Sequence, residues 1–115
     1  MEKRYDLEER TEEFAKAVLI LCKKLTKNVE NIELVKQEVR ASGSVGANYI
    51  EANDSLSKKD FALRIKICRK EAKESRYWLK LLSSINDGHG EEFKGLIQES
   101  TELMNIFGAI LKKSV

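Results

Sequence analysis

The chain has 115 residues, which is enough for one hydrophobic core but too few for two stable ones, so we expect a single domain over residues 1–115. Charged residues make up 35% and hydrophobic residues 42%, a composition too apolar for a disordered chain. The net charge of +2 excludes a strongly acidic or strongly basic molecule, although the charge is unevenly spread along the sequence.

The first predicted helix spans about residues 7–26. Apolar side chains recur there at alternating steps of four and three, the spacing of one helical face. These positions are Leu7, Thr11, Phe14, Val18, Leu21 and Leu25. Proline is absent from the whole chain, so few points force the backbone out of a helix. Further apolar groups widen this stripe, which favours contact with more than one neighbouring helix.

A second helix is predicted over about 32–53, with Asn31 as its N-cap. Its periodic positions are Ile32, Val35, Val39, Ser42, Gly46 and Tyr49. Residues 40–48 are mostly small, and each glycine weakens a helix by about 1 kcal/mol relative to alanine, so a loop is an alternative there. We favour a continuous helix, because the periodicity resumes in phase at Tyr49 and small side chains let another backbone approach closely.

The third predicted helix spans about 58–85 and follows a turn at 53–55. Ser57 is its expected N-cap, with Asp60 three residues later as in a capping box. One apolar stripe consists of Phe61, Ile65, Cys68, Ala72, Ser75, Leu79 and Leu82. A second consists of Leu63, Ile67, Trp78, Leu81 and Ile85. Two stripes indicate a helix with two packed faces.

A fourth helix is predicted over about 91–112, after a turn at 86–90 that contains two glycines. Its periodic positions are Phe93, Leu96, Ser100, Leu103, Phe107 and Ile110. Connections this short join antiparallel neighbours. The expected fold is therefore all-α, an antiparallel up-down-up-down four-helix bundle.

The chain shows neither the apolar segment of a signal peptide nor an uninterrupted apolar run of about 18 residues. We therefore expect a soluble cytoplasmic protein with no membrane contact. Cys22 and Cys68 lie among aliphatic residues, where a free thiol behaves as a small buried hydrophobe.

Catalytic and metal-binding patterns are missing. The single histidine, His89, lies between two glycines in a predicted turn, and we expect an exposed loop residue there. The paired Glu-x-x-His motifs of carboxylate-bridged metal bundles are absent, and Gly43–Gly46 lacks the Lys-Ser/Thr of a phosphate-binding loop. A helical ribonuclease, the remaining enzymatic alternative, would need arginine and histidine at spacings that do not occur. The sequence predicts a binding protein with no catalytic residue, metal site or cofactor.

Positive charge accumulates between residues 58 and 80, where the sequence contains nine Lys/Arg and three acids, a net charge of +6. Six of these residues share one broad helical face, namely Lys66, Arg69, Lys70, Lys73, Arg76 and Lys80. A phosphate backbone could follow this face, with Lys58, Lys59 and Arg40 as weaker contacts. The alternative is a solvated face, balanced by the acidic first and fourth helices of the same or a neighbouring subunit.

Two acids interrupt the basic stretch, Glu71 and Glu74. Lys70 and Glu74 are neighbours at i,i+4, so we expect these acids to join an ion-pair network within the helix or between subunits rather than to act in catalysis. Beside them, Tyr77, Trp78 and Leu81 provide the aromatic and apolar groups that oligomer interfaces favour. A protein-interaction or scaffolding module without nucleic-acid binding is thus the second functional hypothesis.

Three blocks of sequence carry a family resemblance: Val39–Ala52, Ser57–Phe61 and Glu71–Leu79. Their content, order and spacing resemble the bacterial four-helix-bundle family named for the intervening sequences of 23S ribosomal RNA. The chain departs from the common pattern in the basic cluster Lys66–Lys70 and in Ala52, where many relatives have glycine. The first departure adds positive charge to the third helix.

The resemblance implies a bundle that assembles into a ring-shaped homopentamer, in a family most of whose members have no assigned activity. Some members are encoded within inserts of ribosomal RNA genes. Similar proteins are the accessory variability determinants of diversity-generating retroelements, whose basic pentamer binds a reverse transcriptase and nucleic acid. The partners expected from the resemblance are therefore further copies of the chain, RNA or DNA, and a nucleic-acid enzyme such as a reverse transcriptase.

Overall fold

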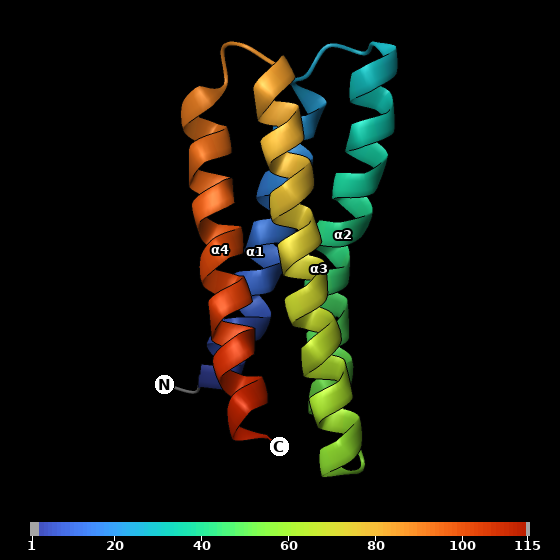
Figure 1. Ribbon diagram of the computed structural model, residues 1–115, viewed down its shortest axis with the longest axis vertical. Coiled ribbons are helices and arrows are strands. Elements are labelled where there is room, and N and C mark those ends of the chain that lie inside the picture. The colour runs from blue at the N-terminus through green and yellow to red at the C-terminus, as the bar shows by residue number, and fades with distance from the viewer. Residues whose placement is uncertain (1–2, 115) are drawn as a thin grey trace.

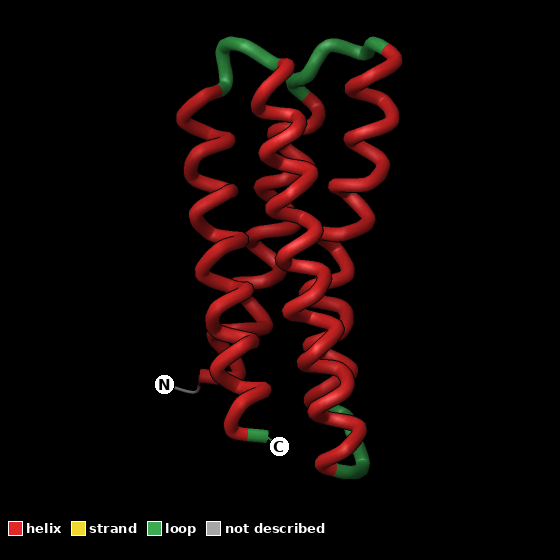
Figure 2. Tube along the Cα trace, viewed as in Figure 1, coloured by secondary structure: helices red, strands yellow, loops and turns green. Residues whose placement is uncertain are grey.

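The computed structural model describes residues 3–114, with side chains from Leu7 onward. It contains α1 (Lys3–Lys23), α2 (Val29–Asn53), α3 (Lys58–Ile85) and α4 (Gly90–Lys113). The helices run alternately up and down, so that the α1–α2 and α3–α4 connections lie at one end of the molecule and the α2–α3 connection at the other (Figure 1, Figure 2). No strand occurs in the described part of the chain, and the expected antiparallel four-helix bundle is confirmed.

The four helices form a square in which α3 packs against α2 and α4. The remaining helix, α1, packs against α2 and more lightly against α4. It lies diagonally across from α3, which passes in front of it in Figure 1. The bundle is elongated, with extents of 44 × 27 × 19 Å. This arrangement places four acids near the start of α1, Glu8, Glu9, Glu12 and Glu13, and the basic third helix on different sides of the molecule.

Side-chain caps fix where α2 and α3 begin. The hydroxyl of Ser57 accepts a hydrogen bond from the Asp60 N–H at 3.0 Å, so the expected cap and the range 58–85 are confirmed. The expected cap of the second helix is wrong, because α2 begins at Val29. Asn28 caps it, and its side-chain oxygen accepts a hydrogen bond from the Asn31 N–H at 2.8 Å.

Asn31 instead links the α1–α2 connection to the α3–α4 connection, which lie at the same end of the bundle. Its buried side chain donates to Asn86 Oδ1 at 2.9 Å and accepts from Asn86 Nδ2 at 2.8 Å. It also donates to the carbonyl of Thr26 at 2.8 Å. That carbonyl is outside a helix because α1 ends at Lys23, three residues before the predicted end. A buried amide with all these partners holds the α1–α2 and α3–α4 connections together.

The buried face of α2 is rotated from the one that the apolar spacing predicted. Its buried residues are Asn31, Glu38, Ala41, Ser42, Val45, Tyr49 and Ala52. Ile32, which the sequence analysis assigned to the core, is 44% exposed. Ser42 and Tyr49 are buried as predicted, whereas the prediction for the first half of the helix is wrong, because polar side chains there were not expected in the core and Asn31 and Glu38 are buried.

The core draws on all four helices. Phe93 and Phe107 are its largest fully buried side chains, and the Phe107 ring lies 5.6 Å from the ring of Tyr49 on α2. Cys68 is buried as expected, whereas Cys22 is half-buried, and both thiols are free. Burial raises the pKa of Cys22 to about 11 and that of Cys68 to about 12. Over the described residues, no helix is both long and apolar enough to cross a membrane.

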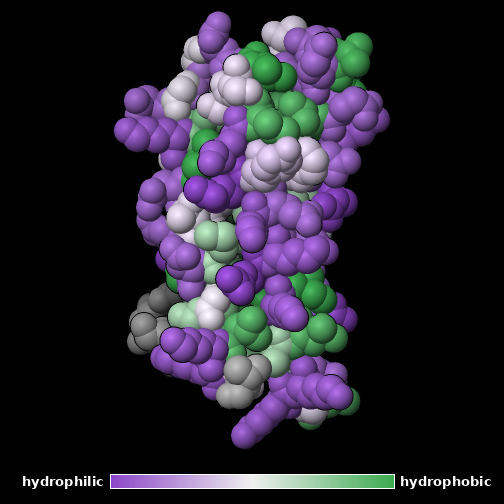
Figure 3. Space-filling model, viewed as in Figure 1, coloured by the Kyte–Doolittle hydropathy of each residue, from purple (hydrophilic) through white to green (hydrophobic). Residues whose placement is uncertain are grey.

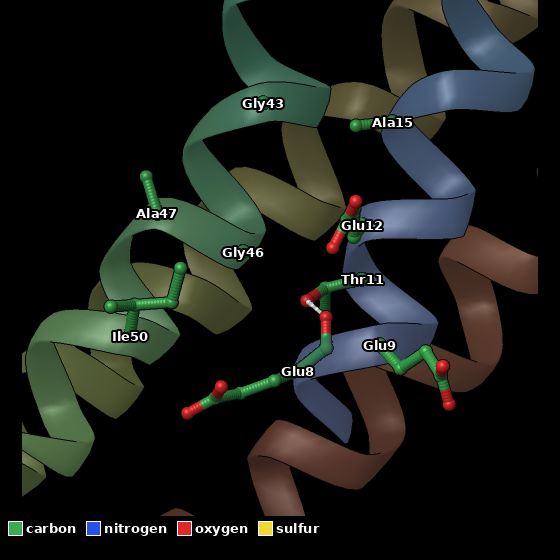
Figure 4. Close-up of a pocket in the computed structure, with 9 residues that line it drawn as sticks. All are labelled: Glu8, Glu9, Thr11, Glu12, Ala15, Gly43, Gly46, Ala47 and Ile50. Atoms are coloured by element: carbon green, nitrogen blue, oxygen red, sulfur yellow. Dashed lines mark hydrogen bonds between the residues drawn. The ribbon is translucent and has the colours of Figure 1, made fainter. Parts of the chain in front are cut away.

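The small residues of α2 allow a close approach by α1. The segment is continuously helical, as expected, and Gly46 faces Thr11 (Figure 4). A Cβ at Gly46 would lie 2.9 Å from Thr11 Oγ1 and 3.2 Å from Thr11 Cβ. The Thr11 hydroxyl is fixed by hydrogen bonds to the carbonyls of Leu7 and Glu8, both at 2.9 Å. Glycine at this position therefore lets the two helices pack without a clash.

Alanine substitutions at the two glycines of this segment should have opposite effects. Gly43→Ala should raise the free energy of unfolding by about 1 kcal/mol, because alanine favours the helix and no heavy atom lies within 4 Å of the new Cβ. Gly46→Ala should lower it by about 1 kcal/mol, because overpacking against Thr11 outweighs the same gain in helix propensity. Urea unfolding measures both changes, and equal stabilisation by the two variants would contradict the close contact between α1 and α2.

Candidate nucleic-acid interface

All six basic residues singled out in the sequence lie on the side of α3 that faces away from the core. The opposite side buries Ile65, Cys68, Ala72, Leu79 and Leu82. Of the six, only Arg76 is half-buried, and the other five are exposed. We call Lys66, Arg69, Lys70, Lys73, Arg76 and Lys80 the basic face. Figure 3 views the molecule from this side and shows hydrophilic side chains over the middle of α3.

Lysines form the centre line of the basic face. Lys66, Lys73 and Lys80 recur every seven residues and are all exposed. Seven residues are close to two helical turns, so the three side chains follow nearly one line of about 21 Å, which we call the lysine line. A charged row of this length matches about six nucleotide steps of a duplex strand.

The two arginines lie toward α4. The Arg69 side chain reaches α4, because a Cβ at Gly108 would lie 3.6 Å from Arg69 Nε, in ordinary van der Waals contact. Arg76 has a buried Nε that makes no hydrogen bond within the described chain. The basic face therefore extends from the lysine line toward the α3–α4 boundary.

Two of the three acids of α3 pair with one arginine of α2. Arg40 bonds to Glu71 at 3.3 Å and to Glu74 at 3.1 Å, and Glu71 is buried. The prediction of an i,i+4 ion pair between Lys70 and Glu74 is wrong, because Glu74 pairs with Arg40 instead. Lys70 approaches only Glu71, at 3.9 Å. Arg40, expected as a weak nucleic-acid contact, therefore joins α2 to α3 through its guanidinium group.

The acids of α1 and α4 pair away from α3. Arg10 of α1 bonds to Glu99 and to Glu102 of α4, both at 2.7 Å. Lys24 bonds to Glu92 at 2.6 Å. Hydrogen bonds from these partners, and from Gln98 in the case of Glu102, hold the pKa of both Glu92 and Glu102 below the ordinary value. The predicted balancing of the basic face by acids of the same chain is thus not formed among the described residues.

The basic face consequently carries charge without acidic partners. Lys66, Arg69, Lys73, Arg76 and Lys80 form no ion pair among the described residues, and Lys70 has only its long contact with Glu71. Lys58 and Lys59, the other weak candidates, are exposed in the first turn of α3 and form no ion pair with the side chains described over residues 7–114.

The three predicted interface residues occupy different positions. Tyr77 is 55% exposed, whereas Trp78 and Leu81 are half-buried. The rings of Tyr77 and Trp78 meet nearly edge to face, with centroids 5.0 Å apart and planes at 66°. Trp78 lies one turn beyond Glu74, which pairs with Arg40 of α2. With exposed Ile85, Trp78 and Leu81 form an apolar edge along one side of the basic face, and exposed Leu63 lies on the same side about 22 Å before Trp78.

A groove of about 440 Å³ separates α1 from α2 near the small-residue segment. Its lining residues are Glu8, Glu9, Thr11, Glu12, Ala15, Gly43, Gly46, Ala47 and Ile50 (Figure 4). Three carboxylates give it an acidic rim, and one of them, Glu8, accepts a hydrogen bond from Asn53 at 2.6 Å. Small residues on α2 make the hollow, and acids on α1 give it a negative charge.

Glu38 is a carboxyl group buried between helices that the sequence pattern did not predict. Its side chain is fully buried, Ser75 of α3 donates a hydrogen bond to Glu38 Oε2 at 2.7 Å, and Glu38 Oε1 has no partner in the described chain. Burial raises the pKa of Glu38 to about 8, although the Ser75 hydrogen bond acts in the opposite direction. The available signal was its position, since Glu38 lies seven residues after Asn31 and seven before Val45, on the buried face of α2.

His89 precedes α4 without capping it. Its Nδ1 lies 3.2 Å from Glu92 Oε1, and its side chain is 26% exposed, less than expected for a loop residue. Nowhere in the described part of the chain do three or more His, Cys, Asp or Glu side chains group so that they could hold a metal ion. The basic face, the apolar edge and the acidic groove are therefore considered as binding surfaces.

Comparison with known proteins agrees with the bundle architecture. The model of the 23S rRNA-intervening sequence protein family matches residues 3–109. The chain is also similar to a protein of unknown function from the S23 ribosomal protein family of Bacteroides thetaiotaomicron VPI-5482, known from its crystal structure. The TM-score is 0.86 and the identity 32%, over 96% of this chain and 99% of that one. No curated protein matches the chain.

Proposed function

The chain belongs to the 23S rRNA-intervening sequence protein family, and on this premise we propose that it is a non-enzymatic homo-oligomer that binds RNA through the basic face of α3. The observation that carries the proposal is the lack of acidic partners for five of the six basic side chains among the described residues. Arg40 offsets one of the two negative charges of Glu71 and Glu74, and the nine Lys/Arg of α3 outnumber its three acids, so the field along the lysine line stays positive. Unpaired cations in a row attract a polyanion and release its counterions on binding.

The apolar edge supports the homo-oligomeric part of the proposal. Ile85 is 51% exposed and lies one turn beyond the half-buried Leu81, and Trp78 precedes Leu81 by three residues. Aromatic and aliphatic groups of this kind are enriched in the buried centres of subunit interfaces. Contact through the apolar edge leaves the lysine line open to RNA, and a ring of five copies is the assembly expected from the family resemblance. An RNA-bound ring could also serve a reverse transcriptase as an accessory factor.

A second candidate function is a scaffold in which the basic face makes subunit contacts. The observation that favours it is the acidic groove, which offers Glu8, Glu9 and Glu12 as partners for the lysines of a second copy. Different surfaces would meet in such a contact, and repeated contacts of this type build rings or filaments. In this case the lysine line would be covered and RNA would not bind.

The test is a titration with RNA at several salt concentrations, using mobility shift or fluorescence anisotropy. If all six cations contact phosphates of a single strand, the logarithm of the affinity should fall with the logarithm of the salt concentration with a slope of about −4. Light scattering on the same samples gives the particle mass. A stable oligomer that fails to bind RNA even at low salt would reject the RNA proposal and favour the scaffold, and a monomer would reject the assembly in both.

A further inference from the structure

An aromatic ring stands within the basic face. Tyr77 follows Lys73 by four residues and precedes Lys80 by three, so it shares their side of α3. It is 55% exposed, although tyrosine carries a large apolar ring. Lys70 lies seven residues before it, again on nearly the same line. Cations thus surround an accessible aromatic face.

The ring of Tyr77 is supported from one side. Trp78 meets it nearly edge to face at 5.0 Å, and Trp78 is itself half-buried with its indole N–H inside the protein. This neighbour restricts the ring while leaving more than half of the side chain exposed. A supported ring loses less conformational entropy on binding a flat ligand than a free one would.

The combination of ring and cations selects between forms of nucleic acid. In a duplex the bases are stacked on one another and paired, so an aromatic ring on a convex helix meets only the backbone. In a single strand each base has a free face, and aromatic side chains between cations are the usual platform for it. The row Lys73, Tyr77, Lys80 supplies a phosphate contact on each side of one stacking position.

We infer that Tyr77 is a base-stacking residue and that the basic face binds single-stranded nucleic acid in preference to duplex. The inference rests on the proposed function and adds the form of the ligand. It reassigns Tyr77 from the expected oligomer interface to the ligand surface, and it leaves Trp78 and Leu81 on the apolar edge.

The experiment compares two probes by fluorescence anisotropy, a single-stranded RNA of about 20 nucleotides, longer than a typical single-strand site, and the same RNA annealed to its complement. The variants are Tyr77→Ala, Tyr77→Phe and Lys73→Gln. Tyr77→Ala should weaken binding of the single strand about tenfold and leave duplex binding and the salt dependence unchanged. Tyr77→Phe should bind like the wild type, because it keeps the ring. Lys73→Gln should weaken binding of both probes.

The remaining outcomes separate this inference from the proposed function. If the wild type binds both probes equally and Tyr77→Ala changes neither, the stacking role is overturned while RNA binding stands. If Tyr77→Ala lowers the particle mass measured by light scattering, the residue belongs to a subunit contact and the inference is overturned. If the wild type binds neither probe, the proposed function fails and the inference fails with it. Quenching of Trp78, the one tryptophan of the chain, by single strands but not by duplex would support stacking beside it.

Discussion

Replacing Glu38 by glutamine is expected to stabilise the protein at alkaline pH and to remove much of the fall in its stability above about pH 5. The carboxyl group is fully buried between α2 and α3, with one hydrogen bond from Ser75 and one oxygen without a partner in the described chain. Glutamine keeps an oxygen that can accept the Ser75 hydrogen bond but never becomes charged. Its benefit should therefore grow as the wild-type carboxyl ionises.

The direction of this pH dependence follows from the pKa of Glu38, which burial raises from 4.5 to about 8 in the folded protein. Below about pH 4.5, Glu38 is protonated in both the folded and the unfolded states, and its ionisation does not lower the free energy of unfolding. As the pH rises toward the higher value, the unfolded chain loses its proton first, so the stability falls. Between about pH 5 and about pH 9, the gap in unfolding free energy between Glu38→Gln and the wild type should widen by on the order of 4 kcal/mol.

Chemical unfolding at a fixed protein concentration across this pH range measures the gap, and fixing the concentration keeps the contribution of assembly constant. Glu51→Gln is the matched control, because Glu51 is on the same helix but exposed. That variant should follow the wild-type pH dependence. Parallel curves for Glu38→Gln and the wild type would show that the buried carboxyl is not the source of the fall.

The fold was predictable where the sequence contains local signals. Ser57 and Asp60 mark the start of α3, and alternating steps of three and four follow its core face over the whole helix. The continuity of α2 through Gly43 and Gly46 was also predictable, because the helical spacing of apolar residues resumes at Tyr49 without a shift in register. Local caps and periodicity act within one helix, so they are visible without the neighbouring helices.

Features that depend on two helices were not predictable from local pattern. Arg40 was expected near nucleic acid, yet it pairs with Glu71 and Glu74, because the register of α2 against α3 brings it to those carboxylates. Glu38 was overlooked because a charged residue is normally assigned to the surface, and only the packing of α2 against α3 reveals the hydroxyl of Ser75 beside it. The side of α3 occupied by the six basic residues could be predicted, since it depends on helical periodicity alone.

Neutralising the lysine line should produce the largest loss of RNA binding. The triple variant Lys66→Gln, Lys73→Gln and Lys80→Gln removes three exposed charges that have no acidic partner in the described chain. Affinity for single-stranded RNA should fall on the order of a hundredfold at moderate salt, and the slope of log affinity against log salt should become less steep by about 2. The fold should be retained, because all three side chains point away from the core.

A control with the same change in net charge shows that position matters and not total charge. Lys16→Gln, Lys36→Gln and Lys112→Gln remove three exposed lysines from α1, α2 and α4. Two of these already pair with acids, Lys16 with Glu12 at 3.1 Å and Lys36 with Glu33 at 3.6 Å. Their loss should change RNA affinity only a few-fold, through the long-range field. Equal losses in both triple variants would mean that RNA responds to the overall charge of the bundle and would remove α3 as its binding surface.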